Sequence, residues 1–439
     1  MSQLALKSGG AILALVLSWT SATAADLDLP PAVEASVRSA VDDGGRIGVV
    51  LGYSRDGETT FFGYGSTALD QGAPVDADTI FEVGSVTKVF TAEMLAARVL
   101  HGAVTLDTPL AAIWPDRRID PALTLADLAT HRAGLPRNIP AAALTNGDDD
   151  SLLAALDEVS GAQDASYSNA GMAILARALV VESGQTLTTL LEQSITGPLG
   201  LDSTGYRVVD PERLARPHIG QSDVSATRVQ TAAIAHGAGG LYTTARDLMT
   251  LLKSHQPHPS GAIDTPADLA LAGVDGVPLG WRVHEGNGSR IFHHGGEAEG
   301  YQAFIGLNQN TGVRVVLLAN SSVEDDLQQI ALHLLDPQTP LPAFQQAQPV
   351  AAFDHLTGTY EIEGEEDGSS ITLVNLGDGL GYVETGPDGA VVRRSRLEAV
   401  GPAEFRLRGT PIIIRVSGAD PDRARLIVGD QQMSLVRTD

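Results

Sequence analysis

The sequence predicts an α+β protein: one antiparallel sheet with flanking helices and an inserted helical lobe, followed by a small all-β C-terminal domain. Three patterns predict this fold. Segments with strand character occur at 47–64 and again at 280–319, and they enclose an Ala/Leu-rich helical stretch from about 105 to 255. After about residue 352, short alternating segments are separated by turns. Strands that enclose helices indicate one sheet with the helices packed on it.

The elements of the larger part can be assigned in chain order. Residues 47–54 and 58–64 are expected to form a hairpin, with Arg55-Asp56-Gly57 as its turn. The next helix is expected to begin at Ser85 and to stop at Gly102. Further helices are expected at 123–130, 171–182, 187–195 and 324–335, and further strands at 280–283, 290–293, 301–307 and 313–319.

Three further segments lie outside the larger part of the chain: one at the N-terminus and two after residue 335. Residues 1–24 are typical of a signal peptide, because an apolar run at 11–19 precedes the small-residue site Ala22-Thr23-Ala24. We expect cleavage after Ala24 and a periplasmic or secreted protein without a membrane anchor. Residues 336–350 are rich in Pro, Gln and Ala and are expected to be a linker. Residues 351–439 are expected to form the all-β domain, as a lipocalin-like barrel or a sandwich.

Composition excludes several classes of function. The chain has 54 acidic and 29 basic residues, a net charge of −25, so it would repel nucleic acid and anionic membrane surfaces. It has no cysteine, which excludes disulfides, cysteine nucleophiles and thiolate metal sites. We expect no nucleic-acid partner.

The first candidate cluster is Ser85 with Lys88. Residues three apart lie on the same side of a helix, which is the spacing of a serine nucleophile and its base. The only other lysines are Lys7 and Lys253, while arginine supplies nearly all the remaining positive charge. A buried lysine can lose its proton and an arginine cannot. The alternative is a helix cap followed by a solvated lysine.

Two more clusters contain polar groups in short loops. Tyr167 and Asn169 stand two apart before a helix, so an extended loop would direct both at one substrate; the alternative is a helix cap. His294-Gly295-Gly296 follows a strand, and the alternatives are a turn with a surface histidine pair or a metal site. No His-Glu-x-x-His or other ligand spacing supports a metal, so no metal site is predicted.

Taken together, the three clusters resemble the penicillin-recognising serine hydrolases. This family includes class C β-lactamases, low-molecular-weight D,D-carboxypeptidases, D-aminopeptidases and related esterases, with the pattern Ser-x-x-Lys, Tyr-x-Asn, then Lys or His-x-Gly. The pattern occurs here as Ser85-Val-Thr-Lys88, Tyr167-Ser-Asn169 and His294-Gly-Gly296. Flanking segments such as 129–136 and 239–248 are also similar to the family. The match spans roughly 35–335, so residues 25–335 are expected to form a β-lactamase/transpeptidase-like serine hydrolase domain.

The resemblance implies a role for each residue. Ser85 would be the nucleophile, and Lys88 and Tyr167 would share the proton transfers, with either as the general base. Asn169, His294, Gly295 and Gly296 would bind substrate. The backbone N–H groups of Ser85 and Glu297 would form the oxyanion hole.

The same resemblance implies a serine hydrolase that works through an acyl-enzyme and needs no cofactor. Its expected substrates are D-alanyl peptides of peptidoglycan, β-lactams, or both. A carboxylesterase of the same fold is an alternative, because ester, amide and lactam carbonyls share one acyl-transfer mechanism. A protein that is acylated by penicillins without turnover is an alternative of another class. A histidine replaces the lysine of Lys-Thr-Gly at position 294, which argues against efficient β-lactam turnover.

Overall fold

The computed structural model describes residues 27–438 with short gaps, which fall at 43–44, 70–71, 227–229, 256–261, 287, 324–325, 345–355, 365–367, 376–379, 388–390, 402, 408–409 and 418–419. The expected signal peptide and part of the expected linker therefore lie outside the described residues. The predicted fold class is confirmed: a mixed sheet-and-helix unit precedes an all-β barrel.

The larger unit is built on a six-stranded antiparallel sheet with strand order β2-β1-β10-β9-β8-β7. The predicted hairpin forms, and its turn has a positive φ at both Asp56 and Gly57, which matches the right-handed twist of the strands. Strands from both ends of the unit meet where β1 pairs with β10. The strands are β1 (Gly48–Arg55), β2 (Glu58–Gly65), β7 (Arg282–Gly286), β8 (Ser289–Ala298), β9 (Tyr301–Asn308) and β10 (Arg314–Ala319).

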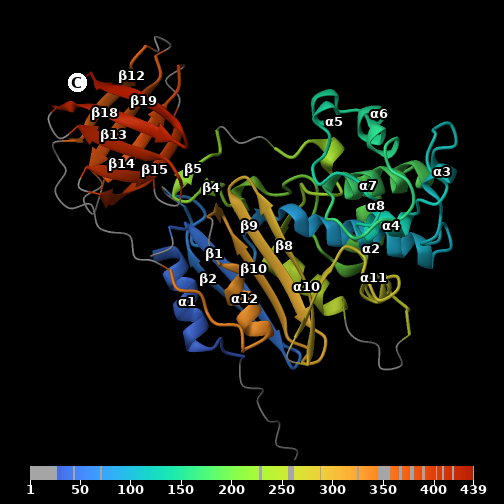
Figure 1. Cartoon of the computed structure of the whole chain (residues 1–439). Helices are drawn as coiled ribbons and strands as arrows, with labels where there is room; N and C mark the ends of the chain where they lie inside the picture. The colour runs from blue at the N-terminus through green and yellow to red at the C-terminus, as the bar shows by residue number, and fades with distance from the viewer. Residues whose placement is uncertain are drawn as a thin grey trace, which may run out of the picture.

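Helices cover both faces of this sheet (Figure 1). On one face, Val49 and Leu51 pack with α1 (Pro31–Asp42) and α12 (Gln328–Leu335). On the other face, Val50 faces a larger core that includes α2 (Thr87–Leu100) and α10 (Ala245–Ser254). This alternation along β1 is expected of a strand buried on both faces. The site described below lies on the α2 side.

The helical lobe lies between β3 (Ile80–Glu82) and β7 in sequence and beside α2 in space (Figure 1). Its longest helix is α7, and α5 lies near the mouth of the pocket described below. Its helices, with the neighbouring α11, are α3 (Leu110–Ile113), α4 (Leu125–Ala129), α5 (Ala141–Asn146), α6 (Asp149–Leu153), α7 (Asn169–Ser183), α8 (Leu187–Leu191), α9 (Gly197–Leu199) and α11 (Pro266–Ala272). Within the described residues, no helix has the length and apolarity needed to cross a bilayer.

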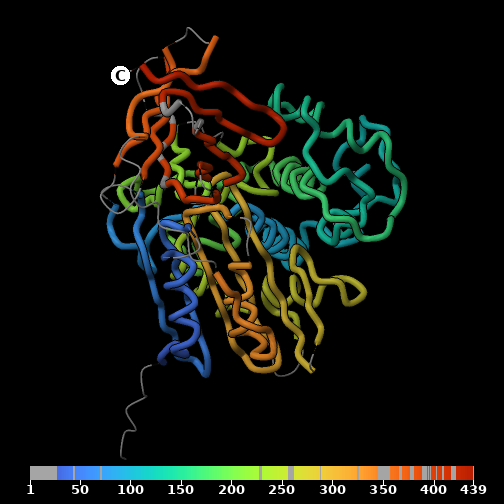
Figure 2. The backbone as a smooth tube through the Cα atoms, turned by 60° about the vertical axis from the view of Figure 1, so that its left-hand side comes forward, coloured from blue at the N-terminus to red at the C-terminus, as the bar shows by residue number. Residues whose placement is uncertain are grey.

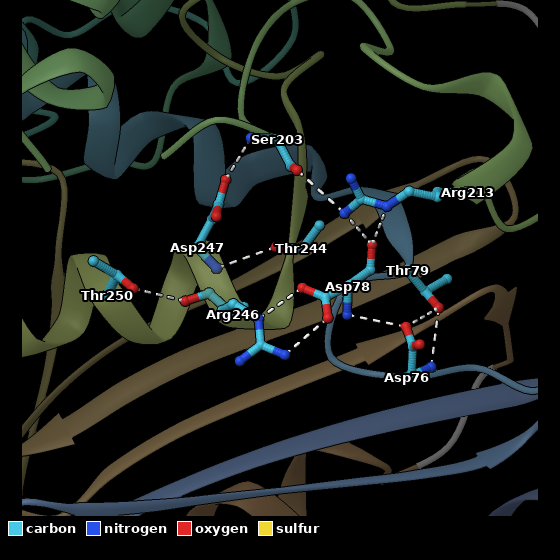
Figure 3. Close-up of polar contacts among 9 residues, drawn as sticks. All are labelled: Asp76, Asp78, Thr79, Ser203, Arg213, Thr244, Arg246, Asp247 and Thr250. Carbon is cyan, nitrogen blue, oxygen red and sulfur yellow. Dashed lines mark hydrogen bonds and ion pairs between the residues drawn. The ribbon is translucent and has the colours of Figure 1, made fainter. Parts of the chain in front are cut away.

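A polar cluster anchors the short strand β3 (Ile80–Glu82), which leads directly to Ser85 (Figure 3). Arg246, in the first turn of α10, donates to both carboxylate oxygens of Asp78, at 2.7 and 2.8 Å. Arg213 donates to the backbone carbonyl of Asp78 and to Ser203. β3 also pairs with β6 (Tyr242–Thr244), so the start of the Ser85 turn is fixed from two sides.

A closed eight-stranded antiparallel barrel follows the larger unit. β12 pairs with β19, which closes the barrel, and side chains that include Tyr360, Tyr382 and Phe405 fill its interior. The strands are β12 (Gly358–Ile362), β13 (Ser370–Asn375), β14 (Leu380–Thr385), β15 (Val391–Gly401), β16 (Glu404–Leu407), β17 (Ile413–Ser417), β18 (Asp420–Val428) and β19 (Gln431–Arg437).

The barrel lies beside a small three-stranded sheet at one end of the larger unit (Figures 1 and 2). This small sheet has the order β11-β4-β5, and β15 of the barrel contacts β5. Its strands are β4 (His218–Ile219), β5 (Ser222–Asp223) and β11 (Ser321–Ser322). The barrel therefore contacts the segment that leads towards the pocket wall at 231–239.

Candidate active site

Ser85 lies in a single 3₁₀ turn, Gly84–Val86, and α2 begins two residues later, at Thr87. The sequence suggested that the helix itself would begin at Ser85. The difference arises at Gly84, whose φ of 47° is the left-handed conformation that favours glycine. A Cβ at Gly84 would lie 2.2 Å from the backbone oxygen of Glu297 and 2.8 Å from its nitrogen. The turn that carries Ser85 is therefore packed directly against the backbone of β8.

Three polar groups converge at Ser85. Its Oγ lies 3.0 Å from Lys88 Nζ and 2.8 Å from the phenol oxygen of Tyr167. Lys88 Nζ also donates to the backbone carbonyl of Ala238, at 2.7 Å. The structure thus brings the hydroxyl, the amine and the phenol into one hydrogen-bonded group from segments that are far apart in sequence.

Lys88 is completely buried. Burial lowers the pKa of Lys88 to about 7, and the nearby guanidinium groups of Arg282 and Arg137 act in the same direction. A substantial fraction of Lys88 is therefore a neutral amine at neutral pH. A neutral amine can accept the Ser85 proton while it donates to Ala238.

The pKa of Tyr167 is shifted in the opposite direction to that of Lys88. Burial raises the pKa of the Tyr167 phenol above its ordinary value, although the Ser85 hydrogen bond, Arg282 and Arg137 oppose this rise. The phenol is thus protonated at neutral pH and donates to Ser85 Oγ. The two groups that flank Ser85 differ in function, since one can accept a proton and the other can supply one.

Ser168 stands between Tyr167 and Asn169, and its conformation explains why the side chains of these two residues point the same way. Its side chain caps α7 by accepting from the backbone N–H of Gly171, and its own backbone is extended. Side chains on either side of an extended residue point the same way. Asn169 lines the pocket, and its backbone N–H donates to the carbonyl of Arg137 at 2.8 Å. The cap is therefore Ser168, and Asn169 remains available to a ligand.

His294 is buried beside Tyr167, with 6.3 Å between the ring centroids. Burial lowers the pKa of His294 well below its ordinary value, and Lys88 contributes in the same direction. Its Nδ1 lies 2.7 Å from the carbonyl oxygen of Gly295, which can only accept, so Nδ1 carries the proton. His294 is therefore a neutral imidazole with a free lone pair on Nε2 at neutral pH, and it supplies no positive charge.

The two glycines after His294 face opposite sides of the sheet. A Cβ at Gly296 would lie 2.0 Å from the backbone oxygen of Val83, so this position brings β8 against the turn of Ser85. A Cβ at Gly295 would lie about 3.0 Å from the side chain of Gln328, on α12. No side chain at position 295 would reach the α2 side. Ser85 and Glu297 both line the pocket.

The pocket has a volume of about 340 Å³ and opens beside Ser85. Its wall combines apolar residues, such as Ile139 and Leu144, with the acidic residues Glu297 and Glu299. Its lining residues are Gly84, Ser85, Asn138, Ile139, Leu144, Asn169, Thr231, Ala235, Ala238, Gly239, Glu297, Ala298 and Glu299. Within the described part of the chain, no group of three or more metal-ligating side chains is arranged to hold an ion.

Three further residues surround Tyr167, and the sequence motifs did not identify them. The ring of His131 lies 4.8 Å from that of Tyr167, and its Nδ1 accepts from the backbone N–H of Ser168 at 3.2 Å. The guanidinium carbons of Arg137 and Arg282 lie 5.1 and 4.9 Å from the Tyr167 ring centroid. His131 stands in a segment that already resembled the family, whereas no spacing rule could have indicated Arg282.

Comparison with known proteins agrees with these features. The family model described as Beta-lactamase matches residues 33–337. The D-alanyl-D-alanine-carboxypeptidase/endopeptidase AmpH of Escherichia coli (strain K12) is 32% identical over 226 residues, which cover 48% of this chain and 58% of AmpH. The chain thus spans little more than half the length of that relative.

Solved structures extend the likeness in fold. A class C beta lactamase from Rhodobacter sphaeroides has a TM-score of 0.61 and 26% identity, and the match covers 70% of this chain and 99% of that one. The crystal structure of SurE has a TM-score of 0.59 at 22% identity and covers 93% of this chain and 98% of that one. The second alignment shows that the fold likeness includes the C-terminal barrel.

Proposed function

This chain belongs to the beta-lactamase family, as its motifs predicted, and on that premise we propose that it is a serine hydrolase that works through an acyl-enzyme on Ser85. Its proposed substrates are D-alanyl peptides of peptidoglycan, β-lactams, or both. The observation that carries the proposal is the position of Ser85 Oγ, within hydrogen-bonding distance of both Lys88 Nζ and the Tyr167 phenol. This is the arrangement of a nucleophile between a base and an acid.

In the proposed acylation, Ser85 Oγ forms a bond to the substrate carbonyl carbon while its proton moves to Lys88 Nζ. The neutral fraction of Lys88 makes it the better base of the pair, because the Tyr167 phenol keeps its proton at neutral pH. The bond to the leaving group then breaks, and the leaving group takes its proton from Tyr167. The proton on Lys88 returns to the phenolate, and water later releases the acyl group from Ser85.

The developing oxyanion is proposed to accept hydrogen bonds from the backbone N–H groups of Ser85 and Glu297. The close packing of Gly84 and Gly296 against the facing backbones supports this role, because it holds the two segments together. Loss of one such donor typically costs about 3–4 kcal/mol of transition-state stabilisation. The side-chain amide of Asn169 is proposed to bind the substrate amide, and His294 Nε2 is proposed to orient Tyr167.

The proposed location is the periplasm or the extracellular space. The support is the pattern of residues 1–24, which is typical of a signal peptide. Peptidoglycan peptides would be accessible to the protein there.

A substrate panel tests the proposed activity. We expect the purified protein to turn over nitrocefin or release D-alanine from an acyl-D-Ala-D-Ala peptide, and to hydrolyse p-nitrophenyl acetate. Turnover of the ester alone would favour the carboxylesterase alternative, which the apolar wall formed by Ile139 and Leu144 also suits. A stoichiometric burst of nitrocefin without turnover would favour the binding-protein alternative, and no reaction with any of the three would contradict the proposed function.

The pH dependence of acylation follows from the state of Lys88. Because Lys88 must be neutral to accept a proton and its pKa is lowered to about 7, kcat/KM for a neutral ester should rise with pH and level off above about pH 8. Burial lowers the pKa of His131 to about 4, so this histidine cannot produce a rise near neutrality. Stopped-flow acylation measured from pH 5 to 9 checks this expectation, and a rate that is flat or falling across that range would exclude Lys88 as the base.

A further inference from the structure

We propose that His131 is a positioning residue for Tyr167, and that proton transfer to the leaving group depends on it. The inference rests on the proposed function, in which Tyr167 protonates the leaving group. It starts from the backbone of His131, which has a φ of 59°. Within the described residues, Asp56 and Asp275 are the other non-glycine residues with a positive φ, and each precedes a glycine in a tight turn. His131 is followed by an arginine instead.

The backbone at His131 favours glycine. His131 follows the end of α4, and its N–H donates to the carbonyl of Leu128 at 3.3 Å. The N–H of Arg132 donates to the carbonyl of Asp127 at 2.7 Å. These two bonds form a Schellman motif, in which the residue at the position of His131 is left-handed and usually glycine. A residue with a Cβ is less stable in that conformation than glycine is. The chain therefore accepts strain to keep an imidazole here, and strain of this kind gathers at functional sites.

His131 holds the residues on both sides of Tyr167. Its backbone carbonyl accepts from the N–H of Ser166 at 2.8 Å, and its Nδ1 accepts from the N–H of Ser168 at 3.2 Å. Its ring lies against that of Tyr167, with 4.8 Å between the centroids and an angle of 41° between the planes. Any residue at this position would supply the carbonyl contact, but glycine would supply neither the Nδ1 contact nor the ring contact. The imidazole therefore adds two contacts to Tyr167 and its neighbour that offset the strain.

The imidazole of His131 is neutral at every pH at which Lys88 can act as a base. Burial lowers the pKa of His131 to about 4, and the charges of Lys88 and Arg282 act in the same direction. A neutral imidazole that accepts at Nδ1 carries its proton on Nε2. Because the pKa of Lys88 is lowered only to about 7, the contact from Ser168 to Nδ1 is intact whenever Lys88 is neutral.

The contacts of His131 fix the direction of the phenol. Tyr167 donates to Ser85 Oγ at 2.8 Å, and the same phenol must reach the leaving-group oxygen when the intermediate breaks down. A displacement of about 1 Å in such a group can cost about a hundredfold in rate. Without the imidazole, the N–H of Ser168 loses this acceptor and the Tyr167 ring loses a packing partner. Ser85 and Lys88 belong to a different segment, so the nucleophile and its base should keep their positions.

Two esters of one acid separate this proton transfer from the rest of catalysis. p-Nitrophenolate is a weak base and leaves without a proton. Ethoxide is about as basic as the serine alkoxide, so ethyl acetate needs an acid to react. The ratio of kcat/KM for ethyl acetate to that for p-nitrophenyl acetate should fall about tenfold in His131→Gly. His131→Asn should give an intermediate ratio, because asparagine tolerates a positive φ and its side-chain oxygen can accept from Ser168.

Tyr167→Phe tests whether His131 acts through the phenol. This variant should lower the same ratio by about a hundredfold or more, because it removes the acid itself. The addition of His131→Gly should then cause no further fall, since residues that act through one group are not additive. A structural defect unrelated to the phenol would lower both kcat/KM values and leave their ratio unchanged. Asp56→Gly is the matched control, because it relaxes the same backbone conformation outside the pocket lining and should not change the ratio.

The possible failures are distinguishable. If both His131 variants keep the wild-type ratio, or if His131→Gly lowers the ratio further in the Tyr167→Phe protein, the positioning role is wrong and the serine hydrolase function stands. The same holds if the wild-type protein hydrolyses p-nitrophenyl acetate but not ethyl acetate, because Tyr167 then supplies no proton. Should the glycine variant not fold, His131→Asn decides, since its ratio should still lie below the wild-type value. If the wild-type protein hydrolyses neither ester, the proposed function fails and the positioning role fails with it.

Discussion

Ser85→Ala should abolish ester, peptide and β-lactam turnover together. Removal of a serine nucleophile from a comparable catalytic group lowers kcat by about 10⁴-fold or more. The fold should remain intact, because Ser85 Oγ makes its side-chain hydrogen bonds to Lys88 and Tyr167, within the site itself. The measurements are single-turnover kinetics with all three substrates, and intact-mass detection of the acyl-enzyme after reaction with a penicillin.

Ser183→Ala is the matched control for this variant. Ser183 ends α7 and donates within its own helix, so its loss should leave every rate unchanged. A mass increase on the Ser85→Ala protein, or turnover above one hundredth of the wild-type rate with any substrate, would show that another residue is the nucleophile.

Lys88→Met should remove nearly all acylation and stabilise the fold at the same time. The methionine side chain fills a similar volume but cannot accept the Ser85 proton, so we expect a loss of about 10³-fold or more in the acylation rate. Lys88→Arg should be equally inactive, because a guanidinium keeps its proton in a protein. Stopped-flow acylation with p-nitrophenyl acetate measures both losses.

The expected gain in stability follows from the pKa of Lys88, which falls from 10.5 to about 7 on folding. Between these values the unfolded chain binds more protons than the folded chain, so wild-type stability should increase as pH rises from 7 towards 10.5. Lys88→Met removes this dependence. The stability difference between the variant and wild type should therefore shift in favour of the variant between pH 10 and pH 7, by on the order of 3 kcal/mol. The net gain at pH 7 is smaller than the full pKa contribution, because the carbonyl of Ala238 loses its donor.

Urea unfolding at pH 7 and pH 10 measures this difference. Lys253→Met is the control, because Lys253 lies in the last turn of α10, away from the pocket lining. A stability difference between Lys88→Met and wild type that is the same at pH 7 and pH 10 would mean that folding does not lower the pKa of Lys88. The neutral-base argument would then be wrong.

The features that could be predicted from sequence were those set by local spacing. The alternating segments around Asp56-Gly57 predicted a hairpin, since residues that accept positive φ define such a turn. The three-residue interval between Ser85 and Lys88 predicted that their side chains lie together, because residues three apart are neighbours on a helical turn. Tyr167 and Asn169 stand on either side of an extended residue, so their common direction also followed from local geometry.

Features that depend on long-range packing could not be predicted in this way. The helix starts at Thr87 because Gly84 is packed against Glu297, a residue more than two hundred positions away. The neutral state of His294 depends on its burial beneath Tyr167, and the sequence does not reveal burial of a single histidine. Arg137 and Arg282 meet only through the pairing of β7 with β8 and the contact of one loop with α7.

The strand order of the main sheet has a consequence for how the protein matures. Val49 on β1 pairs with Ala319 on β10, so the first strand to be synthesised lacks its central neighbour until most of the chain exists. Pairing of such distant segments is intrinsically slow. The β8 backbone that contacts the Ser85 turn is also made late. A nascent chain therefore carries a dormant nucleophile, and reactivity is acquired only when folding is nearly complete.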